Sequence, residues 1–164
     1  VVFHLLRTPG EYGELAALTA LTALAPYVPV AKMVDRAASP KPFIGLTFFL
    51  FAAFPFCLVL LPKTGLPVMA ALAIAFVVNG LRELGEPARK ALISSGFPPE
   101  IRARAVGLYW GLRSLAFFPA PLVSYVLWTQ LGPDAAFLIG GSIGMLGTLW
   151  FWLRVRCQPA SGPA

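Results

Sequence analysis

Long apolar runs without a single charge follow one another along this chain. They contain 17, 21, 18, 20 and 19 residues and cover Leu15–Ala31, Pro42–Pro62, Thr64–Leu81, Ser114–Pro133 and Ala135–Leu153. An α-helix rises about 1.5 Å per residue, so about 20 residues cross a hydrocarbon layer of about 30 Å. The pattern therefore predicts an all-α, polytopic bundle of five transmembrane helices.

Flanking residues extend these runs, and the expected spans are 13–31, 42–62, 65–95, 104–129 and 134–154. We expect an extracytoplasmic loop at 1–14, a transmembrane bundle at 15–157 and a disordered cytoplasmic tail at 158–164. Five prolines interrupt the runs, namely Pro26, Pro29, Pro55, Pro119 and Pro121. In lipid such prolines are tolerated as kinks, because neighbouring groups satisfy the freed carbonyls.

The composition agrees with lipid as the solvent for most of the chain. Hydrophobic residues make up 58% and charged residues 12%, whereas soluble domains have about 25% charged residues. The net charge of +6 does not indicate nucleic-acid binding, because the basic residues lie in the gaps between apolar runs. The expected partner of the chain surface is the lipid bilayer.

The basic residues also predict an orientation. With five alternating crossings, 31–41, 82–104 and 154–164 lie on one side and hold ten Lys and Arg residues, whereas the other side holds only Arg7 and Lys63. Basic loops favour the cytoplasm. We therefore expect an integral protein of the cell (inner) membrane with a cytoplasmic C-terminus.

Many of the charged residues lie in one segment, which begins at Arg82 and continues the third apolar run as a helix. Glu86 follows Arg82 by four residues and precedes Arg89 and Lys90 by three and four, so a ladder of opposite charges is available, with Glu83 beside it. Either this helix leaves the membrane near Arg82, or its charges face a polar cavity within a larger bundle. For Arg113, deeper in the next run, we favour an aqueous cavity.

Small residues and reactive residues add little to this picture. Gly107 and Gly111, and likewise Gly140 and Gly144, are four residues apart, a spacing typical of close helix packing. The two cysteines and the single histidine form no metal-ligand motif, and neither HExxH nor GxSxG is present. We therefore expect no catalytic residues, no metal and no cofactor, and the protein is not expected to be an enzyme.

Two motifs resemble the major facilitator superfamily of secondary transporters. The stretch GLRELGEPARKALISSGFPPEIRARAVGLY, residues 80–109, resembles that family's tenth helix, its cytoplasmic link and the start of its eleventh helix, including P-P-E-x-R-x-R-A-x-G at 98–107. AKMVDRAASPK, residues 31–41, resembles the family's loop motif G-x-L-x-D-R-x-G-R-K. Asp35 and Arg36 match that motif, whereas Ala31 and Ala38 stand where it has glycine.

The resemblance implies a partial fold, with the five spans as helices eight to twelve of a permease whose N-terminal helices are missing from this chain. The start at Val1 fits such a fragment. It implies transport of a small solute by alternating access around a midplane cavity, with proton coupling through Glu83 or Glu86. The implied cavity residues are Arg82, Glu83, Glu86, Arg89, Lys90 and Arg113, and the implied cytoplasmic latch is Asp35, Arg36, Arg102 and Arg104. The alternative is a non-transporting scaffold or sensor on the same fold.

Overall fold

The computed structural model describes residues 8–37 and 39–155, without the side chains of Asp35, Ser94 and Ser95. Every regular element within these residues is helical, which confirms the all-α prediction. The α-helices are α2 Pro9–Leu24, α3 Tyr27–Arg36, α4 Lys41–Leu60, α5 Val68–Leu81, α6 Glu86–Ser95, α7 Pro99–Phe117, α8 Ala120–Leu131 and α9 Pro133–Arg154, with 3₁₀ turns η1 Leu61–Lys63 and η2 Arg82–Gly85. Residues 1–7 of the expected loop and the expected tail at 158–164 lie outside the described residues.

The described helices join into five segments that are long and apolar enough to cross a membrane, as predicted. They are Pro9–Val34, Lys41–Lys63, Val68–Ile93, Pro99–Leu131 and Pro133–Arg154. The first segment begins at Pro9, inside the expected loop. The Thr8 hydroxyl accepts from the Glu11 N–H (3.3 Å), and the Glu11 carboxylate accepts from the Thr8 N–H (3.4 Å). This capping box satisfies donors at the helix start, so the helix begins earlier than its apolar run does.

Prolines divide two of the spans. α2 and α3 are separated at Ala25 and Pro26, and α7 and α8 are separated at Phe118 and Pro119. A proline inside a helix removes one N–H donor and clashes with the preceding turn, which accounts for the breaks. Pro55, by contrast, lies inside an uninterrupted α4.

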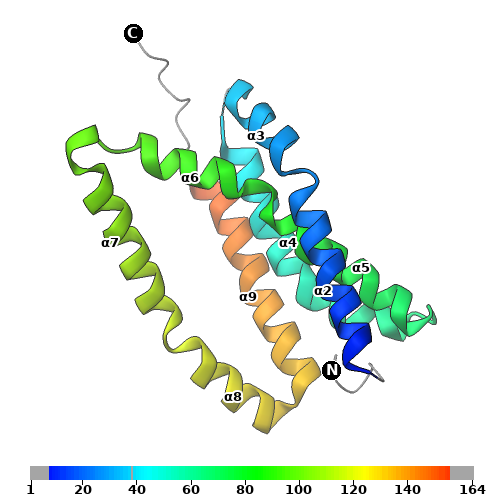
Figure 1. The fold of residues 1–164 in the computed structure, drawn as a ribbon. Helices are drawn as coiled ribbons and strands as arrows, with labels where there is room; N and C mark the ends of the chain where they lie inside the picture. The colour runs from blue at the N-terminus through cyan, green and yellow to red at the C-terminus, as the bar shows by residue number, and fades with distance from the viewer. Residues whose placement is uncertain (1–7, 38, 156–164) are drawn as a thin grey trace.

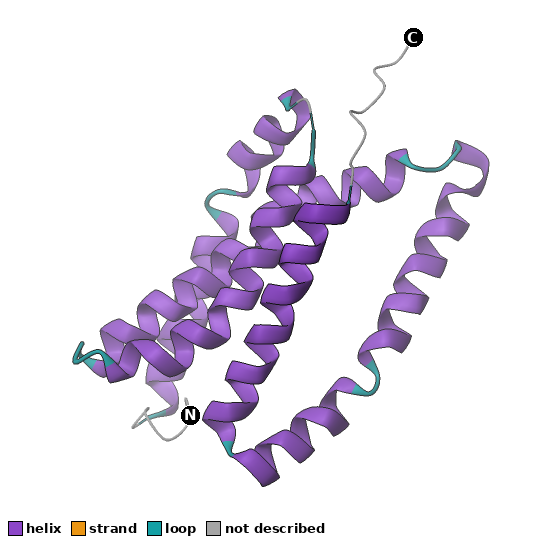
Figure 2. Cartoon of the chain, turned by 180° about the vertical axis from the view of Figure 1, so that it is seen from behind, coloured by secondary structure: helices purple, strands orange, loops and turns teal. Residues whose placement is uncertain are grey.

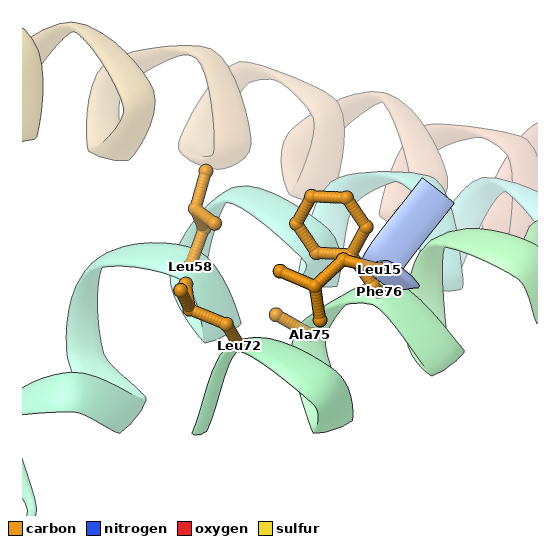
Figure 3. Close-up of a cluster of buried hydrophobic side chains, with 5 residues drawn as sticks. All are labelled: Leu15, Leu58, Leu72, Ala75 and Phe76. Atoms are coloured by element: carbon orange, nitrogen blue, oxygen red, sulfur yellow. The ribbon is translucent and has the colours of Figure 1, made fainter. Parts of the chain in front are cut away.

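α4 is the central helix of the bundle. It packs along α9 on one side and along α5 on another, and α2 covers α5 (Figure 1). A cluster of buried apolar side chains forms where α2, α4 and α5 meet, made of Leu15, Leu58, Leu72, Ala75 and Phe76 (Figure 3). The Thr19 hydroxyl of α2 also donates to the Phe76 carbonyl of α5 (3.1 Å), so both apolar packing and a hydrogen bond join these helices.

The contact between α4 and α9 depends on small residues. A Cβ atom at Gly144 would lie 3.0 Å from the Cβ of Ala52, and a Cβ at Gly141 would lie 2.8 Å from the Phe56 ring. At Gly140, and at Gly107 and Gly111 on α7, no atom of the described residues lies within 4 Å of such a Cβ. Of the four glycines expected to pack, Gly144 therefore meets a neighbour within the described chain, as does Gly141, which the spacing did not single out.

α7 and α8 form an arm that stands apart from the other helices (Figure 2). Neither helix has a buried residue. The arm is held at its two ends, where α7 follows α6 and where α8 packs against α9. One face of α7 lies opposite α4 and α6, and the three helices line a cavity that is described below.

The two ends of the bundle differ in charge. α3, α6 and the start of α7 lie at the same end (Figure 1), where the sequence places most basic residues. There the Lys41 ammonium donates to the Trp152 carbonyl (2.9 Å) in the last turn of α9, where a cation is favourable. The opposite end carries the exposed pair Lys63 and Asp134 (2.6 Å), which links η1 to the start of α9.

Candidate functional site: a charged cavity between α4, α6 and α7

The site begins with a change of helix type in the middle of the third span. α5 ends at Leu81, one 3₁₀ turn follows as η2, and α6 starts at Glu86. Pro87 has no N–H to donate to the carbonyl of Glu83, and the Glu86 N–H donates to that carbonyl instead. A 3₁₀ stretch inside a longer helix often marks a functional hinge or a sequence under strain.

Thr47 of α4 fixes this turn in place. Its hydroxyl, which is buried, accepts from the Gly85 N–H at 2.7 Å. A Cβ at Gly85 would collide with the Thr47 side chain and with the Phe43 carbonyl. Only glycine therefore lets η2 approach α4 closely enough to form this bond.

Two ion pairs follow from this backbone. Arg89 binds Glu86 at 2.5 Å, and both side chains are only 16% exposed. Arg82 binds its neighbour Glu83 at 3.2 Å, and these two side chains are 33% and 42% exposed. The Glu86–Arg89 contact is one of those expected from the sequence, whereas Arg82 pairs with Glu83. The Nε of Arg89 is buried without a hydrogen-bond partner, so this pair leaves one donor unused.

The guanidinium groups of Arg82, Arg89 and Arg113 each lie near an aromatic ring. Arg82 lies over Phe51 at 5.0 Å from the ring centroid, and Arg89 lies 5.9 Å from the Trp110 centroid. Arg113 of α7 lies 5.0 Å from Trp110 and 5.1 Å from the centroid of Phe117. Within the described part of the chain Arg113 has no ion-pair partner, so rings alone compensate its charge there.

These side chains line one cavity of about 460 Å³. Its walls come from α4, η2, α6 and α7, and the lining residues are Thr47, Phe48, Phe51, Arg82, Glu83, Glu86, Arg89, Tyr109, Arg113, Ala116 and Phe117. Five of the six expected cavity residues meet here, and the sixth, Lys90, is exposed and does not line it. A larger groove of about 890 Å³ between α4 and α9 is lined without any ionisable side chain, which makes the charged cavity the candidate site.

The charged side chains of the cavity begin part-way along the third spanning segment. Arg82 is near the middle of the segment Val68–Ile93, about 20 Å from its start at about 1.5 Å per residue. The helix continues as α6 beyond Arg82 and the charges face α4 and α7. The described side chains line a cavity, and the depth of these charges in a membrane stays a prediction.

The expected latch residues gather only loosely. Arg36 ends α3, and Arg102 and Arg104 belong to the first turns of α7; all three side chains are exposed. None of them forms an ion pair with an acid whose side chain is described, and the side chain of Asp35 lies outside the described residues. α3 and the start of α7 nevertheless lie at the same end of the bundle (Figure 1).

Six lining residues were not predicted from the sequence. Three belong to α7, namely Tyr109, Ala116 and Phe117. The other three belong to α4, namely Thr47, Phe48 and Phe51. They belong to an apolar run with no charge and no motif, and only the packing of α4 against η2 turns them toward the arginines. For a metal site, the described residues offer no group of three or more His, Cys, Asp or Glu side chains. The functional groups of this cavity are therefore guanidiniums, carboxylates and aromatic rings.

Comparison with known families decides the class of the protein. The sequence model of the Major Facilitator Superfamily matches residues 3–164. The chain belongs to this superfamily. No curated protein and no solved structure matches it.

Membership in the Major Facilitator Superfamily indicates the kind of protein in which the charged cavity lies. Proteins of this superfamily are transporters rather than enzymes, so the chain is an integral membrane protein that acts in solute transport, in contact with the lipid bilayer. The resemblance noted at residues 80–109 and 31–41 is thereby confirmed at the level of the superfamily.

Proposed function

We propose that this chain forms helices eight to twelve of a proton-coupled secondary transporter, a permease that moves a small solute by alternating access. The observation that carries the proposal is the cavity in which Arg82, Glu83, Glu86, Arg89 and Arg113 meet. On this proposal the remaining N-terminal helices belong to the same protein and complete the fold.

The energetic argument concerns five charges on two spans. At the centre of a lipid-exposed helix each would cost about 2.5–3.5 kcal/mol, so five would cost about 12–18 kcal/mol. The Glu86–Arg89 ion pair and the aromatic rings around Arg113 reduce that cost. Apolar residues at these positions would remove the cost entirely. Ionisable groups inside a bundle are by default functional candidates, and in a transporter the function they serve is solute or ion binding.

Glu86 is the coupling group in this proposal. When Glu86 takes up a proton it loses its charge, and its contact with Arg89 (2.5 Å) is no longer an ion pair. The released guanidinium, whose Nε already lacks a partner, can then bind a group on another helix. Because coupling between two bound species is reciprocal, a solute that binds more tightly after Arg89 is released would in turn favour the proton on Glu86.

The moving parts follow from the backbone. The 3₁₀ turn η2 carries Arg82 and Glu83 and joins α5 to α6. Its backbone would bend when the two halves of the transporter rotate against each other during alternating access. Asp35 and Arg36, with Arg102 and Arg104, would act as a latch at the cytoplasmic end. Asp35→Asn should therefore change the balance of inward-open and outward-open states, measured by cysteine accessibility, without changing which solute binds.

The orientation is part of the same proposal. We place the protein in the cell (inner) membrane with its C-terminus and the basic end, which includes Lys41 and Arg102, in the cytoplasm. A thiol introduced at Lys63, at the opposite end, should react with an impermeant maleimide added outside intact cells. Protection of that thiol, with labelling of one introduced at Arg102, would reverse the assignment.

The test is flux in proteoliposomes that contain the full-length protein, screened over solute classes with and without an imposed pH gradient. Gradient-driven flux should be abolished by Glu86→Gln and kept by Glu14→Gln, which removes an exposed carboxylate of α2 outside the cavity. Flux that persists in the Glu86 variant with unchanged dependence on the gradient would refute the coupling role. Absence of flux for every class, from folded protein, would favour a scaffold or sensor.

A further inference from the structure

The lining of the cavity is not electrically balanced. Three guanidinium groups (Arg82, Arg89 and Arg113) face two carboxylates (Glu83 and Glu86). The carboxylates are both engaged, one with Arg82 and one with Arg89. One positive charge, that of Arg113, remains without a counter-charge among the described residues.

Arg113 is presented in a way that suits an incoming anion. Its two ring contacts hold the guanidinium at 5.0 Å from Trp110 and 5.1 Å from Phe117. Neither ring offers an oxygen or nitrogen acceptor, so the five N–H donors of the guanidinium are not satisfied by them. A planar fork of donors matches the two oxygens of a carboxylate in a bidentate contact.

The excess of one positive charge in the cavity lining favours some anions over others. While Glu86 is ionised and paired with Arg89, a carboxylate brings one negative charge, which neutralises the single excess positive charge of the cavity. A phosphate monoester brings about −1.5 to −2 at neutral pH and would leave excess negative charge beside Glu83 and Glu86. A cationic solute would add to the positive excess.

The rest of the lining describes the remainder of the ligand. Phe48, Phe51, Tyr109 and Phe117 form most of the wall around the charged groups. Sites for small organic molecules are lined mainly by apolar and aromatic side chains with a few polar groups that fix orientation. A volume of about 460 Å³ lies within the usual range for such sites, about 300–1,000 Å³.

From these observations we infer that the cavity binds a monocarboxylate with an aromatic or alkyl body. The carboxylate lies on Arg113 and the body lies against the rings of α4 and α7. This inference rests on the proposed transport function, for which it names the substrate class.

The first experiment measures binding without transport. Full-length protein in detergent is titrated in a calorimeter with 2-naphthoate, with the neutral amide 2-naphthamide, and with 2-naphthyl phosphate. Naphthoate should bind tightest. Arg113→Gln should weaken naphthoate binding about 10- to 100-fold, because it removes charge-assisted hydrogen bonds. Arg113→Lys should bind naphthoate with an affinity between those of the unaltered protein and Arg113→Gln, since lysine keeps the charge but cannot form the bidentate contact.

The matched control is Lys32→Gln, which removes one positive charge from an exposed position of α3 outside the cavity. It should leave naphthoate binding unchanged. Equal binding of naphthamide and naphthoate, tighter binding of naphthyl phosphate, or equal weakening by the Lys32 and Arg113 variants would overturn the inference. Thermal unfolding of each variant shows that loss of binding is not loss of fold.

Flux assays separate this inference from the proposed function. If naphthoate binds in the manner described but no solute crosses the membrane, the binding class stands and the transport mechanism falls. If neutral or cationic solutes are carried in a pH-dependent manner while naphthoate does not bind, the transport mechanism stands and the substrate class is wrong.

Discussion

Thr47 is the residue whose alteration tests the architecture of the cavity most directly. Its hydroxyl accepts the Gly85 N–H at 2.7 Å in a buried setting, and this is the described hydrogen bond between α4 and the turn that carries Arg82 and Glu83. Thr47→Val keeps the shape of the side chain and removes the acceptor. The Gly85 N–H would then lose its bond across to α4 and keep only the i→i−3 backbone bond of the 3₁₀ turn.

The size of the effect follows from the burial of that donor. Hydrogen bonds between membrane helices average about 0.6 kcal/mol with a maximum of about 1.7 kcal/mol, because the unfolded chain also finds partners. Thr47 is 8% exposed, so we expect a loss of about 0.6–1.7 kcal/mol of unfolding free energy. Exchange of the Gly85 amide hydrogen should accelerate about 3- to 18-fold.

The assay combines equilibrium unfolding of the full-length protein in mixed micelles with hydrogen exchange followed by mass spectrometry. Thr47→Ser keeps the acceptor and should restore slow exchange at Gly85, although the lost methyl group costs about 0.8 kcal/mol. Thr129→Val removes an exposed hydroxyl that bonds only within its own helix and should change neither quantity. Unchanged exchange at Gly85 in the Thr47→Val protein would refute the role assigned to this bond.

Three further effects follow from the same packing. Gly85→Ala should lower the unfolding free energy by about 1–3 kcal/mol through its collision with α4. Gly147→Ala should be neutral or stabilising, because no neighbouring atom of the described residues lies within 4 Å of the added Cβ; equal losses would contradict this. Lys41→Met should cost about 0.3–1 kcal/mol by removing a cation from the end of α9, seen as a lower unfolding midpoint. Lys63 and Asp134, 60% and 46% exposed, should show a coupling below about 1 kcal/mol in a double-mutant cycle that vanishes near 1 M salt.

Much of the fold could be predicted because lipid imposes a simple rule. A helix that crosses a membrane needs about 20 apolar residues, and the run Pro42–Pro62 meets that rule without ambiguity, so α4 and its boundaries were expected. The start of α2 was less predictable, because the capping box of Thr8 and Glu11 extends the helix beyond its apolar run. Boundaries set by polar caps do not appear in a hydropathy pattern.

The charged members of the cavity could be predicted, but its apolar wall could not. Arg82 to Arg89 stand out because charge is rare in these spans. Thr47 and Phe51 have no such signal, since threonine and phenylalanine are ordinary in a membrane helix. Their role depends on the long-range approach of η2 to α4, which a glycine at Gly85 permits and which no local pattern encodes.

The pairing of the charges shows how one turn of backbone alters chemistry. In an α-helix residues four apart lie about 40° apart around the axis, so Arg82 and Glu86 would face each other. A 3₁₀ helix has three residues per turn and places them about 120° apart. η2 is such a turn, and the expected ladder becomes two separate pairs, Arg82 with Glu83 and Glu86 with Arg89. Loss of charge at Glu86 would therefore act first on Arg89 and leave Arg82 paired, which is what a switch confined to one side of the cavity requires.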